Sequence, residues 1–346
     1  MKIWFPEIDI LKATAILLIV FCHIDNYVSC YDDLIRLVDG YAALIGLSIF
    51  FFISGLLLSH TDSAINSIKD IKNFYSKRFT RIFPLYWVAL ISLAIIFGWL
   101  QVDPGNVKPY DFSLSNLLIH FFGLQGVFPY GNIQSMWFVG VIILFYLLYP
   151  FIAYFSKNLL RTFTISSIIF ILLAILHHFF GLININALMY YPLFVSGIFI
   201  DRLIYSSKRI ADKTILKQTL VLSFSLIFAL LILNNINLQL SPTILTMCTM
   251  IALCIFYLIF ARLFINVHGN KMGIISPIAF GTYAIYLFHH QFLALFTSII
   301  DLIIQNIMLQ DITILTFGIV GVALCGIIIQ KVEQSIFKHY RASHQR

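Results

Sequence analysis

Charged side chains are scarce in this chain of 346 residues. Asp, Glu, Lys and Arg together make up only 11% of it, whereas hydrophobic residues make up 60%. The mean hydropathy is +0.94, a value that soluble domains of this length do not show. This composition excludes a soluble globular protein and indicates a protein embedded in a membrane.

Cysteine is also rare, and several familiar motifs are missing. No two of the five cysteines form a C-x-x-C pair, and four of them, Cys22, Cys248, Cys254 and Cys325, lie in apolar segments. We expect them to be small core residues and not a disulfide framework. The chain also lacks a P-loop, a G-x-S-x-G motif and a G-x-G-x-x-G context. Neither nucleotide hydrolysis nor a soluble type of serine hydrolase is suggested.

Long hydrophobic runs are what the chain has in abundance. A membrane-spanning helix needs about 20 apolar residues. Ten segments qualify: 8–26, 41–60, 82–100, 136–155, 163–180, 187–204, 217–234, 243–264, 278–300 and 311–330. The first lacks the cleavage site of a signal peptide. The sequence therefore predicts an all-α integral membrane protein with about ten transmembrane helices, in which residues 1–335 form one domain and residues 336–346 a basic cytoplasmic tail.

The basic residues predict the orientation of the helices. If the N-terminus is cytoplasmic, all but two of the 22 Lys and Arg fall on the inner side, the exceptions being Arg36 and Lys108. Such an imbalance follows the positive-inside rule and places both termini in the cytoplasm. The net charge of +7 is then explained by attraction to anionic lipids of the inner leaflet, without nucleic acid. We expect a multi-pass protein of the cell membrane.

The first apolar segment carries two ionisable residues, Lys12 and His23, eleven positions apart. Eleven residues turn a helix through about 1100°, so both side chains lie on one face, and the rise between them is roughly 16 Å. One helix thus holds a cation near the inner surface and an imidazole deep in the bilayer. Ionisable groups at this depth are candidates for function. The alternative is a histidine bonded within the bundle and a lysine that reaches the interface.

A second cluster, FYSKRFTRIFPLYW, lies where the expected inner loop 61–81 meets the third span. Arg78 and Arg81 are three residues apart and share a helix face, with Lys77 beside them. Guanidinium groups bind phosphates in bidentate fashion. The alternative is that these residues simply anchor the helix at the interface. Lys12 is expected at the same depth, however, and joins Arg78 and Arg81 as a third cation, which favours a polyanionic ligand.

A third cluster, FGTYAIYLFHHQFL, spans residues 280–293. Tyr286 and His289 share a helix face, whereas His290 is rotated by about 100°. With His23, the second buried imidazole could divide the roles of base and substrate-orienting group, or relay protons. Metal binding would require a third ligand, and no H-x-x-x-H motif or carboxylate cluster is present, so no metal is expected.

Two smaller signals complete the set of candidates. FFFISG places Ser54 and Gly55 in the second span, where small residues allow close approach of a backbone or a ligand chain. Trp137 lies at the outer end of the fourth span. Tryptophan is common at membrane interfaces, but beside the outer loop 101–135 it could also stack on a sugar ring.

Taken in order, these clusters are similar to the acyltransferase-3 family of integral-membrane O-acyltransferases over nearly the whole chain. The resemblance is carried by PEIDILKATAILLIVFCH, FFFISG, SKRFTRIFPLYW, MWFVGVIILFYLLYP and TYAIYLFHH. It implies transfer of an acyl group, often acetyl, from cytoplasmic acyl-CoA to a hydroxyl of a glycan or a similar acceptor. In this resemblance His23 corresponds to the catalytic histidine, His289 to a later conserved histidine, and Arg78 and Arg81 to the donor-site arginines. The family's opening arginine is Lys12 here, which keeps the charge but loses the bidentate fork.

The charges suggest a path for the donor. Lys12, Arg78 and Arg81 are expected to hold the phosphates of CoA, with Asp9 pairing with Lys12. The pantetheine arm would then carry the thioester to mid-membrane, where His23 acts as general base, with Tyr286 and Ser54 in support. A role of His23 as a transient acyl carrier stays open. Acyl-CoA is expected as a substrate, and no permanently bound cofactor is expected.

The acceptor is expected from the outer face, because His23 lies toward the outer half of its helix. There the loop 101–135 offers Tyr110, Tyr130 and Asn132 beside Trp137. Aromatic and amide groups suit a neutral envelope glycan or lipid-linked saccharide.

Two other classes of protein compete with an acyltransferase. A transporter or flippase would also have ten spans and buried histidines, but such proteins commonly show duplicated halves, and none is visible in this chain. A sensor or assembly protein of the envelope would leave the cations and the histidines without a task.

Overall fold

The computed structural model describes residues 5–29, 33–62, 65–131, 133, 136–155, 158–207, 212–235, 242–268 and 272–343. Every regular element in these ranges is helical, which confirms the predicted all-α fold. The first half contains α1 (Pro6–Ile24), α2 (Asp33–Thr61), α3 (Ile68–Leu93), α4 (Leu114–Phe121), α5 (Trp137–Phe155) and α6 (Leu159–Phe180). The second half contains α7 (Ile185–Ile200), α8 (Lys213–Asn235), α9 (Pro242–His268), α10 (Ile275–Ile303), α11 (Ile307–Thr313) and α12 (Ile319–Ser343).

Nine helices of the described chain are long and apolar enough to cross a membrane, and they correspond to the second through tenth predicted spans. The first predicted span, residues 8–26, forms α1. This helix differs from the nine because it carries Glu7, Asp9 and Lys12 within its first two turns. The structure therefore supports a multi-pass membrane protein with one additional, more polar helix.

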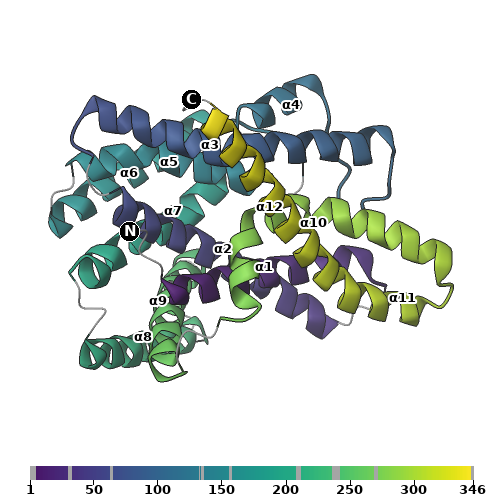
Figure 1. Ribbon diagram of the computed structural model, residues 1–346. Coiled ribbons are helices and arrows are strands. Elements are labelled where there is room, and N and C mark those ends of the chain that lie inside the picture. The colour runs from purple at the N-terminus through teal and green to yellow at the C-terminus, as the bar shows by residue number, and fades with distance from the viewer. Residues whose placement is uncertain are drawn as a thin grey trace.

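Helix α1 lies at the centre of the bundle and packs chiefly against α2, α10 and α9 (Figure 1). Its side chains Leu11, Ala15 and Ile16 are completely buried. Most of the helix surface is thus covered by protein. A helix in this position tolerates ionisable residues because neighbouring helices, and not lipid tails, surround them.

Helix α3 begins much earlier than the apolar run predicts. Ser67 and Asp70 form a capping box, in which each side chain bonds to the backbone N–H of the other at 3.2 and 3.0 Å. The expected inner loop 61–81 is therefore helical from Ile68 onward. The polar first half of α3 escaped the hydrophobicity criterion because that criterion detects only the membrane-buried part of a long helix.

Glycine allows α2 and α7 to approach closely, and these two helices form the most extensive contact in the bundle. A Cβ atom at Gly55 would overlap with the carbonyl oxygen of Phe194, and one at Gly197 would overlap with that of Phe52. The expectation that the FFFISG segment permits close backbone approach is confirmed at Gly55.

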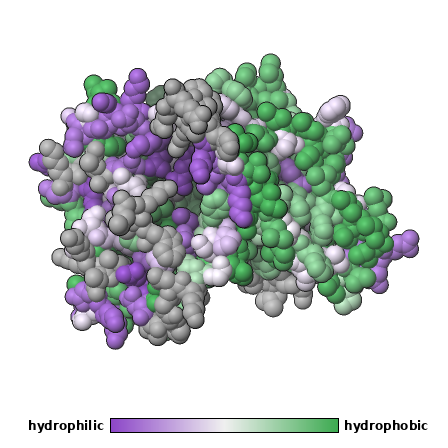
Figure 2. Space-filling view, viewed as in Figure 1, coloured by the Kyte–Doolittle hydropathy of each residue, from purple (hydrophilic) through white to green (hydrophobic). Residues whose placement is uncertain are grey.

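The surface divides into two regions (Figure 2). Hydrophobic residues cover the right of the view, whereas hydrophilic residues gather at the left, the side on which α2 ends and α3 begins. The exposed hydrophobic side chains include Phe170, Leu222 and Leu324 on helices long enough to span a membrane. Such a surface is suited to contact with lipid.

Candidate active site

Three histidines from two helices meet inside the bundle. His23 is in the last turn of α1, and His289 and His290 are in the middle of α10. The ring centroid of His23 lies 4.9 Å from that of His289 and 4.7 Å from that of His290, and the two neighbours on α10 are 4.3 Å apart. His289 and His290 are buried, whereas His23 is partly accessible. We call this group the histidine cluster.

Hydrogen bonds to the backbone orient two of these rings. Nδ1 of His23 lies 2.7 Å from the carbonyl oxygen of Ile19, and Nδ1 of His289 lies 2.7 Å from that of Tyr286. A carbonyl oxygen only accepts, so we assign the proton of each neutral ring to Nδ1. Nε2 then carries a free lone pair in both rings, which is the form that accepts a proton or binds a metal.

Tyr27 orients the third ring. Its hydroxyl donates to the carbonyl oxygen of His290 at 3.2 Å and lies 3.3 Å from Nδ1 of the same residue. With the hydroxyl proton used in this way, we assign the proton of neutral His290 to Nδ1, which then donates to the tyrosine oxygen. All three Nε2 atoms are therefore unprotonated in the neutral state. Among the described residues, Nε2 of His289 and Nε2 of His290 have no hydrogen-bond partner.

The loop 101–135, which was predicted to be the outer loop, reaches the end of α1 beside the cluster. The backbone N–H of Asn106 donates to the carbonyl oxygen of Asn26 at 2.9 Å. Gly105 has a φ of +74°, and a Cβ there would overlap with the same carbonyl group, so the close contact needs glycine. The loop thus rests directly next to Tyr27 and the histidine cluster.

The structure brings together the predicted pair His23 and His289 and also places Tyr286 beside them, with ring centroids of Tyr286 and His289 5.9 Å apart. It also adds His290, which sequence reasoning left out. A helical projection separates His289 from His290, but the ring centroid of His23 on α1 lies 4.9 and 4.7 Å from theirs. The adjacent histidines in the sequence were the available signal, and only the position of α1 reveals their joint use.

Two of the three predicted donor cations, Lys12 and Arg81, influence each other electrostatically. The Lys12 ammonium pairs with Asp9 at 3.9 Å and also interacts electrostatically with Arg81, which is exposed on α3. Arg81 in turn interacts with Glu333 of α12. Lys12 and Arg81 therefore border one site at the end of the bundle where both chain ends were predicted to lie.

Arg78 has different neighbours. Its guanidinium forms an ion pair with Asp62 at the end of α2 and lies over the rings of Phe74 and Tyr146, at 5.2 and 5.6 Å from their centroids. Lys77 approaches the same carboxylate at 3.9 Å. These contacts join α2, α3 and α5, so Arg78 has a structural task that the R-x-x-R spacing did not predict.

Two further pairs of ionisable side chains lie near the start of α1, and each contains a buried carboxylate. Glu7 is completely buried and accepts a hydrogen bond from the Tyr205 hydroxyl at 2.9 Å, while Arg262 lies 3.5 Å from its other oxygen. Nδ1 of His60 lies 2.8 Å from Oδ1 of Asp201. Sequence analysis missed both pairs because their members are separated by more than one hundred positions.

The predicted acceptor candidates lie in packed positions. Trp137 stacks on Tyr190 of α7, with centroids 5.9 Å apart. The Tyr130 hydroxyl accepts a hydrogen bond from Asn184 at 2.9 Å, and the buried Tyr110 hydroxyl has no partner among the described residues. The fourth candidate, Asn132, lies outside the described residues. Ser54 lies partly buried on α2, next to the Gly55 contact with α7.

Helix α4 supports this region. Its buried residue His120 contacts the Tyr130 ring edge-on at 5.4 Å, and Nδ1 of His120 lies 2.9 Å from the carbonyl oxygen of Asn116. Burial lowers the pKa of His120, opposed by the Asn116 hydrogen bond and by Asp111. The imidazole is therefore neutral at physiological pH, with Nε2 buried and without a partner in the described structure.

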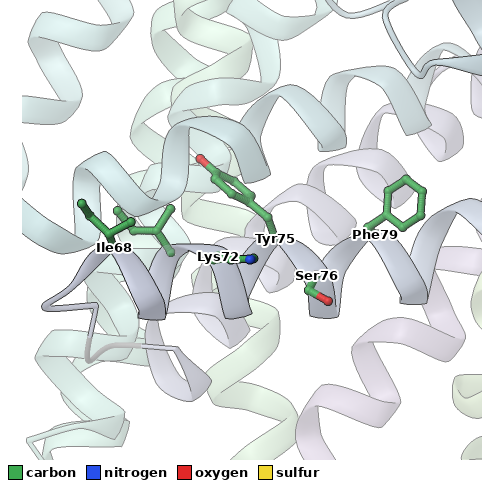
Figure 3. Close-up of a pocket in the computed structure, with 6 residues that line it drawn as sticks. Ile68, Lys72, Tyr75, Ser76 and Phe79 are labelled. Atoms are coloured by element: carbon green, nitrogen blue, oxygen red, sulfur yellow. The ribbon is translucent and has the colours of Figure 1, made fainter.

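A shallow depression on α3 is separate from these groups (Figure 3). It is lined by Ile68, Ile71, Lys72, Tyr75, Ser76 and Phe79. None of these residues belongs to the histidine cluster or to the Lys12–Arg81 pair. The lining is largely apolar and suits contact with lipid more than catalysis.

The fold and the site define a multi-pass α-helical membrane protein with a buried histidine centre. The sequence model of the acyltransferase-3 family, described as an acyltransferase domain, matches residues 5–331 and includes every residue of the site. The chain therefore belongs to the acyltransferase-3 family, which confirms the resemblance of its motifs. No curated protein and no solved structure matches the chain.

Proposed function

We propose that this membrane acyltransferase moves an acyl group, most simply acetyl, from cytoplasmic acyl-CoA to a hydroxyl of a cell-envelope glycan or glycolipid. The observation that carries the proposal is the placement of His23 and Lys12 on the central helix. The imidazole belongs to the buried histidine cluster, and the ammonium lies about 16 Å away along α1, beside Arg81. A cationic site and a base at this separation suit a donor whose phosphates and thioester are joined by a long arm.

The charge of the cationic site supports a polyphosphorylated donor. Lys12 and Arg81 are the groups that we assign to the CoA phosphates, and Asp9 holds the lysine side chain in place. Arg78 is proposed to hold α2 and α3 together beside the donor site without binding the donor itself, because its guanidinium is paired with Asp62. The sequence led us to expect three cations in contact with the donor, and this assignment leaves two of them, Lys12 and Arg81.

The orientation of the His23 ring supports its role as general base. Its Nδ1–H is held by the Ile19 carbonyl, and Nε2 is free to accept the proton of the acceptor hydroxyl. The hydroxyl oxygen then forms the ester bond with the thioester carbonyl, and the C–S bond breaks. The departing thiolate takes the proton from the imidazolium, which returns His23 to its neutral form. His289 and His290 are proposed to accept hydrogen bonds from the acceptor and to keep it oriented.

The position of the outer loop supports an acceptor from the outer face. The loop contacts Asn26 at the end of α1, and Tyr110 and Tyr130 belong to the same loop. Aromatic rings and neutral polar groups suit a sugar more than a phosphate-anchored acceptor.

The test compares envelope glycans by mass spectrometry from cells that lack the gene, express it, or express His23→Gln at an equal membrane level. We expect one acetyl increment on a specific sugar in the wild-type cells alone. A larger increment would replace acetyl by a longer donor. Identical glycans in all three strains would contradict the proposed acceptor class.

A second measurement tests the donor. Purified protein in proteoliposomes is supplied with acyl-CoA on the side of Lys12 and Arg81, or on the opposite side only. Release of free CoA with the first arrangement and not with the second is expected. Equal release from both sides would contradict a one-sided donor site.

A further inference from the structure

The histidine cluster has the composition of a metal site. Each of His23, His289 and His290 offers one ring nitrogen, and these three atoms lie within 4.8 Å of one another. Nitrogen ligands of a tetrahedral zinc ion are about 3.3 Å apart, given Zn–N bonds of about 2.0–2.1 Å. Small rotations of the rings would bring the three atoms to that spacing.

The surroundings of the rings match those of metal ligands. A metal-bound histidine usually donates its second ring N–H to a carbonyl or another acceptor, which fixes the tautomer and orients the ring. Here Ile19 and Tyr286 provide carbonyl acceptors for two rings, and Tyr27 provides an oxygen for the third. The Nε2 atoms are the groups left to bind an ion.

Two of these Nε2 atoms lack a partner although they are buried. His289 is 1% exposed and His290 is 2% exposed, and no described residue bonds to either Nε2. A buried polar atom without a partner is costly. Neutral imidazoles are good ligands for zinc, copper and nickel and poor ligands for magnesium or calcium. The free lone pairs therefore select a divalent transition metal.

We propose that His23, His289 and His290 form a binding site for a divalent transition-metal ion such as Zn²⁺, and that its occupancy blocks acyl transfer. The blocking effect rests on the proposed function, because metal at His23 Nε2 removes the lone pair needed for general base catalysis. Metal binding itself does not depend on that function. The expected absence of metal rested on the lack of a third ligand, and His290 supplies that ligand.

Binding is tested by titrating the purified, metal-free full chain in detergent with Zn²⁺ and counting bound ions. We expect one equivalent, with affinity at least tenfold weaker in His289→Ala and in His290→Ala. The matched control is His178→Ala, which removes an exposed histidine on α6 and should bind as the wild type does. Cobalt(II) provides a spectroscopic probe, since its visible absorption should change on wild-type protein and not on the cluster variants.

Absence of Zn²⁺ binding in the wild type would overturn the site, as would equal binding in both cluster variants when their melting temperatures are near that of the wild type. If a variant unfolds, His290→Gln replaces it, since glutamine keeps a polar side chain but is a poor zinc ligand.

Inhibition is tested by measuring the release of CoA with and without Zn²⁺, and again after a chelator is added. Loss of turnover over the range of binding, reversed by the chelator, is expected. Unchanged or faster turnover with the site occupied would overturn the blocking role. If no turnover occurs either with or without metal, the proposed function fails while the titration still decides the site.

Discussion

Replacement of Arg78 by glutamine should destabilise the protein more than it weakens donor binding. The ion pair with Asp62 joins side chains that are only 15% and 13% exposed. Exposed pairs contribute about 0–1 kcal/mol, and breaking a fully buried pair costs about 3–5 kcal/mol. The contacts with the buried Phe74 ring and with Tyr146 add about 0.5–1 kcal/mol each, the lower part of the range for cation–π pairs.

With about 1–2 kcal/mol for this partly buried ion pair, the loss of stability on Arg78→Gln is about 2–4 kcal/mol. For a chain longer than 200 residues, each kcal/mol lowers the melting temperature by about 2 °C, so a decrease of about 4–8 °C is expected. The assay is thermal unfolding in detergent, combined with titration of acyl-CoA at a temperature where every variant is folded.

Two variants serve as controls for this prediction. Asp62→Asn together with Arg78→Gln should recover part of the stability, because no uncompensated carboxylate is left behind. Arg81→Gln removes an exposed cation of the same type, so the melting temperature should change little while acyl-CoA affinity falls and becomes less sensitive to salt. A wild-type melting temperature in Arg78→Gln, with a loss of affinity equal to that of Arg81→Gln, would refute the structural assignment of Arg78.

His23→Gln should lower kcat for acyl transfer by about 10²–10⁴ with a nearly unchanged melting temperature, and wild-type turnover would contradict its role as base. Lys12→Arg restores a bidentate cation and should keep turnover with equal or tighter acyl-CoA binding in titrations; an inactive variant would mean that the donor site is built differently. Trp137→Ala should raise the acceptor KM without changing acyl-CoA affinity, whereas a lower melting temperature with unchanged KM would limit Trp137 to packing on Tyr190. Because burial lowers the pKa of His120, the unfolded chain takes up its proton first as the pH falls. The stability that neutral His120 contributes is therefore present above its ordinary pKa of about 6.5 and is lost toward acid pH. The wild-type melting temperature should fall more between pH 7 and pH 5 than that of His120→Gln, and equal decreases would contradict this.

Local helix geometry made much of the fold predictable. The run 278–300 predicted α10, which extends over Ile275–Ile303, and the same helical spacing placed Tyr286 and His289 on one face. Such predictions succeed because residues three or four apart on a helix are neighbours in any tertiary context. The start of α3 at Ile68 was not predicted, because a hydrophobic run does not reveal the capped polar turns that precede it.

Contacts between helices were beyond the reach of the sequence. The R-x-x-R spacing placed Arg78 and Arg81 on one helix face, but it contains no information on Asp62. Because Asp62 lies at the end of α2 and pairs with Arg78, Arg78 has a structural role besides any role in ligand binding. The same limit hid His290. His290 belongs to the site only because α1 brings the His23 ring close to it as well as to His289.

The ionisable groups inside the bundle differ in whether another side chain is paired with them. Glu7 is compensated by Arg262, and Asp201 contacts His60, each across helices that are distant in the sequence. Mutual compensation of this kind stabilises the arrangement of helices and requires no ligand. In the histidine cluster three imidazoles meet, and two of their buried Nε2 atoms have no partner in the described chain. An unpaired Nε2 also occurs singly at His120, so the meeting of several such atoms, and not one of them alone, is what suits a substrate or a metal ion.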